Sequence, residues 1–280
     1  MRRLKGEILI IIAATLWGTL GIAGKVAYSY GSTPGQLMFY RMLFLLPAIL
    51  YILPKVKKEH VAPLLVFGAI VVTPFYLIYF YAVKFVGAST AALILYTAPA
   101  YVAVMSAFFL GEPITSKTII ALLLALSGAA LVNITSNVRG DLLGILTAFI
   151  SALLYAMYTV IAKTFVKRGI ESAHVALLPY LSSIPILGLY ALLIEGHIML
   201  ENFGQLSIAL YLAMIPTGLA YILYNYGLRT VEASQASILS TIEPVSATLL
   251  AWILLGEALY ATKIIGATLI ILSAIIVSRK

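Results

Sequence analysis

Apolar runs long enough to cross a lipid bilayer occupy most of this sequence. A membrane-spanning helix needs about 20 mostly apolar residues, and the polar, Gly and Pro clusters divide the 280 residues into ten such runs. Hydrophobic residues make up 62% of the chain and charged residues only 10%, whereas a soluble domain carries about 25% charged residues. The sequence therefore predicts an all-α membrane protein. Its ten transmembrane helices are expected at approximately 7–27, 36–53, 62–83, 88–109, 116–135, 141–163, 174–194, 206–228, 234–255 and 262–278.

The basic residues predict the orientation of these helices, because Lys and Arg gather in cytoplasmic loops. If the ten runs alternate in direction, 12 of the 18 basic residues lie on the side of the N-terminus, three lie opposite (Lys84, Arg139 and Lys263), and three fall inside runs (Lys25, Arg41 and Lys163). Both termini are therefore expected in the cytoplasm, in a protein of the plasma membrane. The formal charge of +8 forms no continuous stripe, so it indicates orientation rather than nucleic-acid binding.

An internal repeat divides the chain into two related parts. A shift of 145 residues lays Tyr76–Val132 over Tyr221–Val277 without a gap, and a shift of 138 relates the earlier segments. We expect two five-helix halves, residues 1–137 and 138–280. An odd number of helices in each half means that the second half begins on the opposite side of the membrane. Such inverted repeats are typical of secondary transporters, which bind their substrates near the bilayer midplane between the halves.

Several short motifs resemble those of one transporter family. They are LWG at 16–18, LGEP at 110–113 and EPVSATLLAWILLGE at 243–257, and 13 residues separate the mid-helix Pro from the following Glu in both halves. Together they resemble the drug/metabolite transporter superfamily, in its ten-helix EamA-type branch. The resemblance implies export of a small organic metabolite such as an amino acid, by alternating access around a midplane cavity. It also leaves open an exchanger of nucleotide sugars or phosphorylated metabolites.

Glu243 is the candidate for the chemistry of the site. It lies near the middle of the ninth run, where its counterpart in the first half is Ala98. A carboxylate at the centre of the bilayer costs about 2.5–3.5 kcal/mol on insertion scales, so such a group is usually paired, protonated or in contact with water. Glu243 is expected either to couple protons or to bind a substrate amine. A structural carboxylate bonded to a neighbouring helix is the alternative.

Two prolines lie at matching depths in the fourth and ninth runs. Pro99 and Pro244 each lack a backbone N–H, which releases the carbonyl four residues earlier, at Leu95 and Ser240. Broken helices at the midplane mark the binding sites of many transporters. Pro99, Pro244 and Ser240 are therefore candidate substrate-binding residues. The alternative is that the prolines only kink the helices for packing.

Aromatic side chains supply the other candidates. Trp17 and its repeat counterpart Tyr155 lie too deep for the aromatic belt at the membrane surface. With Tyr96 and Tyr158 they could line a cavity for a flat organic solute and bind a cation through their ring faces. Packing against lipid or other helices is the alternative. Asn225 joins the candidates because it replaces an aromatic residue of the first half.

Four tyrosines and four charged residues are expected to be structural. Tyr76, Tyr79, Tyr221 and Tyr224 lie nearer helix ends and favour the interfacial belt, with a role as a gate as the alternative. The long side chains of Lys25 and Lys163 can reach the lipid headgroups. Glu112 and Glu257 close the fourth and ninth runs and are expected to connect loops.

Other classes of function lack support in the sequence. There is no Cys, no GxxxxGK[ST] motif and no HExxH motif, and the three His are far apart. We therefore expect no enzyme, no cofactor and no metal site. A membrane-embedded enzyme, a channel and a scaffold are the alternatives to a transporter. The expected partners are a small-molecule substrate, the lipid bilayer and protons, with no nucleic acid; a homodimer is left open.

Overall fold

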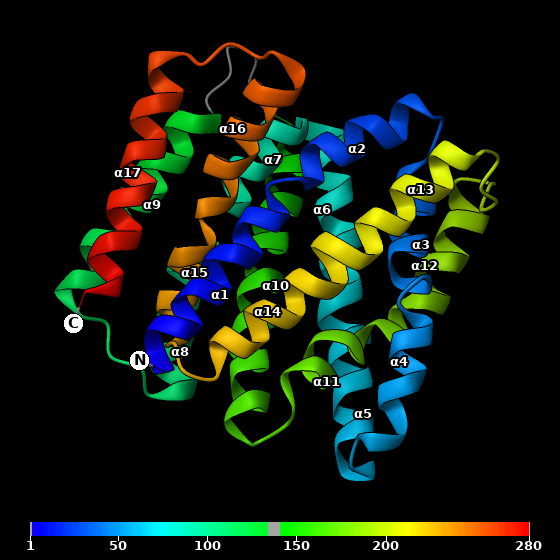
Figure 1. Cartoon of the computed structure of the whole chain (residues 1–280), viewed down its shortest axis with the longest axis horizontal. Coiled ribbons are helices and arrows are strands. Elements are labelled where there is room, and N and C mark those ends of the chain that lie inside the picture. The colour runs from blue at the N-terminus through cyan, green and yellow to red at the C-terminus, as the bar shows by residue number, and fades with distance from the viewer. Residues whose placement is uncertain (1, 134–140, 280) are drawn as a thin grey trace.

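The computed structural model describes residues 2–133 and 141–279, and every regular element in these ranges is a helix (Figure 1). The expected boundary at 137/138 and Arg139 lie outside the described residues. The first half contains α1 (Arg2–Trp17), α2 (Leu20–Ser29), α3 (Pro34–Leu43), α4 (Leu46–Ile52), η1 (Leu53–Lys55), α5 (Lys58–Phe67), η2 (Gly68–Val72), α6 (Thr73–Val86), α7 (Ala88–Leu95), α8 (Ala98–Leu110) and α9 (Ser116–Asn133). The second contains α10 (Leu142–Lys167), α11 (Ser172–Leu177), α12 (Pro179–Ile194), α13 (Phe203–Leu212), η3 (Ala213–Leu219), α14 (Ala220–Leu228), α15 (Ala233–Ser240), α16 (Ile242–Leu255) and α17 (Ala261–Ser278).

These helices combine into ten apolar spans, which confirms the predicted number in the described ranges. Several spans begin earlier or end later than the hydrophobic runs, and the first extends over Arg3–Ser29. Charged first turns remain helical because their side chains can reach the membrane surface. Large apolar side chains such as Phe108 and Phe109, 82% and 74% exposed, cover the exterior. Such a surface requires lipid, so the protein is an integral membrane protein.

Both ends of the chain lie on one side of the bundle, hereafter the terminal side (Figure 1). Arg3, near the start of α1, donates a hydrogen bond from Nη2 to the carbonyl of Val277, near the end of α17, over 3.5 Å. The Gln235 side chain in α15 donates to the same carbonyl over 2.8 Å and to Glu7 Oε1 over 2.8 Å. These bonds join the first, ninth and tenth spans at their terminal-side ends.

The fourth and ninth spans are broken at the predicted prolines. Span four consists of α7 and α8, span nine consists of α15 and α16, and the second helix of each span carries a proline in its first turn. At the breaks, the hydroxyl of Thr97 donates to the Ile94 carbonyl and that of Thr241 donates to the Ile238 carbonyl, each over 2.7 Å. The same two carbonyls also accept the backbone N–H of Thr97 and of Thr241, over 3.0 Å and 3.1 Å, so the threonine at each break closes a tight turn with two bonds to one carbonyl.

Equivalent close contacts recur in the two halves. A Cβ atom on Gly6 would lie 3.0 Å from Cγ2 of Val231, and a Cβ atom on Gly144 would lie 2.5 Å from Cγ1 of Val86. The two glycines are 138 residues apart and the two valines 145 apart, which are the two shifts of the sequence repeat. The π-helical segments η2 and η3 also begin 145 residues apart. The repeat therefore corresponds to matched packing.

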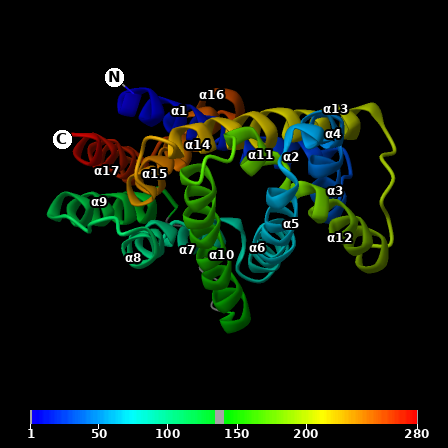
Figure 2. The ribbon, with the colours of Figure 1, turned by 90° about the horizontal axis from the view of Figure 1, so that it is seen from below.

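The last span of each half meets the other at a pair of glycines. Helices α9 and α17 lie side by side at one end of the molecule, far from α3 and α12 (Figure 2). A Cβ atom on Gly128 would lie 2.6 Å from the Gly266 carbonyl oxygen, and a Cβ atom on Gly266 would lie 2.6 Å from that of Gly128. Ser273 Oγ donates to the Ala121 carbonyl over 2.7 Å. Small residues allow these backbones to approach closely.

Substitution of Gly128 by Ala should destabilise this crossing. The added methyl group meets backbone atoms, which cannot move aside, and overpacking of this kind costs about 1–3 kcal/mol. We expect a lower melting temperature for the purified protein in detergent. The matched control is Gly21→Ala, because a Cβ atom at Gly21 would meet nothing within 4 Å. Equal melting temperatures for the two variants would contradict the proposed crossing.

Candidate functional site

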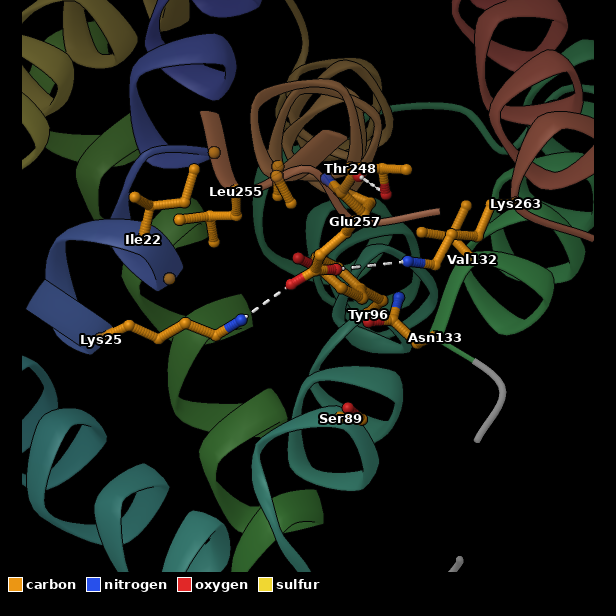
Figure 3. A pocket seen from close by; sticks show the side chains of 15 residues that line it. Ile22, Lys25, Ser89, Tyr96, Val132, Asn133, Thr248, Leu255, Glu257 and Lys263 are labelled. Carbon is orange, nitrogen blue, oxygen red and sulfur yellow. Dashed lines mark hydrogen bonds and ion pairs between the residues drawn. The ribbon is translucent and has the colours of Figure 1, made fainter. Parts of the chain in front are cut away.

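A cavity of about 410 Å³ lies on the side of the bundle opposite the termini. Its lining includes the end of the first span, the start of the fourth, the end of the fifth and the end of the ninth. These helix ends are all remote from the terminal side. We call this cavity the vestibule; its polar lining residues are Lys25, Ser89, Tyr96, Asn133, Thr248, Glu257 and Lys263 (Figure 3).

A second, smaller cavity lies deeper, at the breaks of the fourth and ninth spans. Its volume of about 30 Å³ is close to the share of one water molecule in the liquid. We call it the midplane cavity, and Leu95, Tyr96, Ala98, Pro99, Tyr155, Ser240, Thr241 and Glu243 line it. Tyr96 belongs to the lining of both cavities. Tyr96 therefore borders both the vestibule and the midplane cavity.

Glu243 is the charged group of the midplane cavity. Its side chain is partly buried, near the middle of the span Ala233–Leu255, and interacts directly with the hydroxyl of Tyr96. Tyr79 and Tyr155 are its other electrostatic neighbours. Among the described residues, no ion pair includes Glu243. A carboxylate at this depth without a basic partner needs a proton, a cation or water to offset its desolvation.

The structure brings together most of the residues predicted for substrate binding. Five line the midplane cavity: Tyr96, Pro99, Tyr155, Ser240 and Glu243. Pro244 lines the vestibule. These six come from the two broken spans and from α10. Their role in substrate binding stays a prediction, and their shared position at the break between helices is what the proline argument led us to expect.

Trp17 lies apart from both cavities. Its ring is 3% exposed, and its Nε1 donates a hydrogen bond of 2.9 Å to the Pro216 carbonyl in the π-helical segment η3. The centroid of the Trp17 ring lies 5.0 Å from that of Tyr221 and 5.3 Å from that of Tyr224. In this conformation Trp17 therefore packs in the interior between the first and eighth spans.

Tyr158 and Asn225 form part of the same interior cluster. Nδ2 of Asn225 donates to the Tyr158 hydroxyl and to the Tyr221 carbonyl, each over 2.8 Å. The Tyr158 ring stacks on Phe67 with centroids 5.4 Å apart. Asn225 Oδ1 is buried with no hydrogen-bond partner among the described residues. The polar replacement that marked Asn225 in the sequence thus bonds the Tyr158 side chain to the backbone of α14.

The expectation that four tyrosines form an interfacial belt is wrong for three of them. Tyr76 and Tyr221 are each 8% exposed, Tyr224 is fully buried, and the hydroxyls of Tyr76 and Tyr221 lie 3.4 Å apart. These two residues are repeat counterparts, 145 positions apart. Helices α6 and α14 pass through the centre of the bundle (Figure 1), so their tyrosines meet there. The fourth, Tyr79, is a neighbour of Glu243.

Three charged residues meet at the mouth of the vestibule. Lys25 Nζ donates to Glu257 Oε1 over 2.9 Å, and Lys263 Nζ lies 3.6 Å from Glu257 Oε2 (Figure 3). The hydrogen bond from Lys25 holds the pKa of the Glu257 carboxyl below its usual value. Because the pKa is lowered, the ionised pair persists at neutral pH and is lost as the pH falls through that lowered pKa.

Glu112 and Lys163, the repeat counterparts of Glu257 and Lys25 on the terminal side, are buried. The carboxylate of Glu112 accepts hydrogen bonds from the backbone N–H of Ala233, over 2.8 Å and 3.0 Å, and of Ser234, over 3.3 Å. Lys163 Nζ donates to the carbonyls of Leu228, over 2.5 Å, and Val231, over 2.6 Å. The expectation that Lys163 reaches the headgroups is therefore wrong, because these two carbonyls hold its ammonium group inside the bundle, where the residue is 4% exposed.

Several vestibule residues were not identified from the sequence. Ser89, Asn133 and Thr248 are small polar residues at helix ends or on a helix face, where such residues are also common for packing. Their type and spacing did not distinguish a cavity lining from a helix interface. Position was the one available signal for Ser89 and Thr248, because they lie in the two spans that contain the repeat-related prolines.

Comparisons with known proteins agree with this architecture. A sequence model of the EamA-like transporter family matches residues 4–134 and again residues 142–279. A solved crystal structure superposes with a TM-score of 0.83 at 22% identity, covering 97% of this chain and 95% of that one. That likeness extends over the whole bundle and supports the fold.

Relatives from several prokaryotes are similar over nearly the whole chain. An "uncharacterized transporter" of Archaeoglobus fulgidus is 30% identical over 98% of this chain and 97% of its own length. The Bacillus subtilis "uncharacterized transporter YwfM" is 31% identical, with 98% and 95% covered. The "uncharacterized inner membrane transporter YicL" of Salmonella typhimurium is 25% identical, with 98% and 95% covered.

Proposed function

The chain belongs to the EamA-like transporter family, and from this premise we propose that it is a secondary transporter of a small organic solute, with its binding site at the midplane cavity. The family and the names of the relatives indicate a transporter rather than an enzyme. The fold-level argument alone would be an analogy. The site itself supplies the more specific support.

The position of Tyr96 is the observation that carries the proposal. Its side chain lines both the vestibule and the midplane cavity and interacts with Glu243. A solute that enters the vestibule therefore meets Tyr96 before it reaches the carboxyl group. The 30 Å³ midplane cavity is too small for an organic solute in this conformation. Binding requires Tyr96 to move, which joins the two cavities into one site.

The charge of the site favours an amine as the substrate group. Glu243 has no basic partner among the described residues, and phenolic side chains surround it. A protonated amine of an amino acid or a related metabolite would offset the carboxylate, and the Tyr96 and Tyr155 rings would add cation–π contacts. A phosphorylated solute would be repelled. When no solute is bound, a proton would neutralise the Glu243 carboxylate in place of the amine. Transport would then be coupled to the pH gradient.

Alternating access explains why one side of the bundle is open and the other packed. The vestibule reaches Tyr96 from the side opposite the termini, whereas buried bonds of Glu112 and Lys163 hold the terminal side together. The contact between Tyr76 and Tyr221 lies where repeat counterparts of the two halves meet, as an inverted repeat requires. With the termini in the cytoplasm of the cell, as the loop charges predict, the vestibule faces outward. Release into it would be export.

Reconstitution into liposomes tests the proposal. We expect saturable uptake of at least one labelled amino acid or amine, faster than into empty vesicles, and competition by the unlabelled solute. Nucleotide sugars and sugar phosphates serve as the comparison set, since an anionic substrate would contradict the role given to Glu243. No flux of any of these solutes above the empty vesicles would contradict the proposed function.

A further inference from the structure

We propose that the protein changes state by exchanging two repeat-related pairs of helix-end bonds. Glu112 and Lys163 close the terminal side in this structure. When the opposite side closes, Glu257 and Lys25 form the equivalent bonds, and Glu112 and Lys163 release theirs and bind each other. This inference rests on the alternating access proposed above and names the residues that hold each state.

The closed side is held by bonds to both ends of one turn. The turn between α14 and α15 leaves carbonyls at the end of one helix and N–H groups at the start of the next. Lys163 donates to the carbonyls of Leu228 and Val231, and Glu112 accepts from the N–H groups of Ala233 and Ser234. Each charge lies at the helix end whose dipole favours it. Together they fix the turn against α8 and α10.

Every partner in this arrangement has a counterpart on the vestibule side. The 145-residue shift takes Glu112 to Glu257, and it relates Ala233 and Ser234 to Ala88 and Ser89. It relates Leu228 and Val231 to Val83 and Val86, and the 138-residue shift relates Lys163 to Lys25. The residue types at these positions are the same or similarly apolar. The turn between α6 and α7 could therefore be held by Glu257 and Lys25 in the same way.

On the vestibule side these bonds are absent among the described residues. Glu257 and Lys25 bind each other over 2.9 Å instead, and no described side chain accepts a hydrogen bond from the backbone N–H of Ala88 or Ser89 at the start of α7. Ser89, whose N–H the exchange would pair with Glu257, lines the vestibule together with both charged residues. The vestibule thus lies beside the turn between α6 and α7, where the repeat predicts the bonds of a closed turn.

The ion pair gives the released charges a partner in the open state. The Lys25 and Glu257 side chains are 65% and 38% exposed, so their pair is in contact with water and contributes little stability. The bonds of Glu112 and Lys163 are buried, where an unpaired charge is costly. Each state therefore contains one buried set and one exposed pair. Exchange between sets of the same kind keeps the two states close in free energy, as a transport cycle needs.

Cysteine labelling can measure the balance between the two states, because the chain contains no cysteine. Thr248→Cys places a probe in the vestibule, and Ala103→Cys, its repeat counterpart, places one in the buried terminal half. Lipid nanodiscs expose both sides to a polar maleimide. The measured quantity is the ratio of the two labelling rates, in each background variant, without any substrate.

The labelling ratio is the rate at Thr248→Cys divided by the rate at Ala103→Cys. We expect Glu257→Gln to raise this ratio about tenfold and Glu112→Gln to lower it about tenfold. The loss of a helix cap commonly costs enough free energy to change an equilibrium constant by about that factor. Lys25→Met should act in the same direction as Glu257→Gln. It changes an exposed side chain, so it serves even if Glu112→Gln does not fold. Glu59→Gln, at an exposed carboxylate in the first turn of α5, should leave the ratio unchanged.

The proposed exchange of bonds is overturned if Glu257→Gln and Lys25→Met leave the labelling ratio unchanged, or if they lower it as Glu112→Gln does. Because labelling needs no substrate, the outcome is independent of the proposed function. Opposite shifts in a protein that moves no solute would support the exchange and contradict the transporter. Solute flux without opposite shifts would support the transporter and contradict the exchange.

Discussion

Proteoliposomes that contain the Glu243→Gln variant are expected to lose uptake driven by a pH gradient entirely, down to the level of empty vesicles. Exchange of labelled for unlabelled solute should continue but need a higher solute concentration for half its maximal rate, because the amide can accept a hydrogen bond from the substrate amine but no longer offsets its charge. Gln has nearly the shape of Glu and can still bond to Tyr96, but it cannot bind and release a proton. The measurement is uptake of the identified solute with and without a pH gradient across the same vesicles.

The matched control for this experiment is Glu201→Gln, at a carboxylate that is 65% exposed in the loop before α13. It should keep the pH-driven uptake of the unmodified protein. If Glu243→Gln keeps its pH dependence, Glu243 has no part in the coupling. If it loses exchange and pH-driven uptake together, the charge of Glu243 is indispensable for binding the substrate amine, and the result contradicts the proposed proton coupling at this site.

Trp17→Ala is expected to be the most destabilising single substitution in the central bundle. It removes a ring that is 3% exposed, its hydrogen bond to the Pro216 carbonyl and its contacts with two tyrosine rings. Losses of this kind cost about 3–5 kcal/mol. Trp17→Phe keeps most of the packing and should lose about 0.5–1.5 kcal/mol with the hydrogen bond. Thermal unfolding in detergent measures both.

The other tryptophan provides the control, since the chain contains two. Trp252 is 49% exposed on the outside of α16, and Trp252→Ala should change the melting temperature little. The opposite result at Trp17 would be informative. A Trp17→Ala protein that keeps the melting temperature of the unmodified protein but no longer binds solute would place Trp17 in the substrate site and contradict its assignment to the interior.

The spans and their breaks were predictable from the sequence because apolar runs and repeat-related prolines mark them. A bilayer of constant thickness sets the length of an apolar run, and a proline inside a run removes a helical hydrogen bond. Pro63 and Pro185 lie inside continuous helices, so it is the matched positions of Pro99 and Pro244 in the two halves that singled out the breaks. The position of Glu243 beside the second break needs only the count of residues from the helix end.

The direction in which each side chain points was harder to predict, because depth in the membrane does not determine which side of a helix a residue occupies. Trp17 and its repeat counterpart Tyr155 share a depth, yet Tyr155 lines the midplane cavity and Trp17 packs against Tyr221. The sequence also shows no difference between Lys25 and Lys163. One side of the bundle is closed and the other open, and that asymmetry is a property of the conformation rather than of the residues.

Counterflow is the most direct test that the midplane cavity is one site with alternating access. Vesicles are loaded with unlabelled solute and diluted into a trace of labelled solute without any pH gradient. A carrier should accumulate the label transiently above its outside concentration, with a rate that saturates as the solute concentration rises. Label that only equilibrates, at a rate proportional to concentration and unaffected by the solute inside, would show a channel and contradict this account.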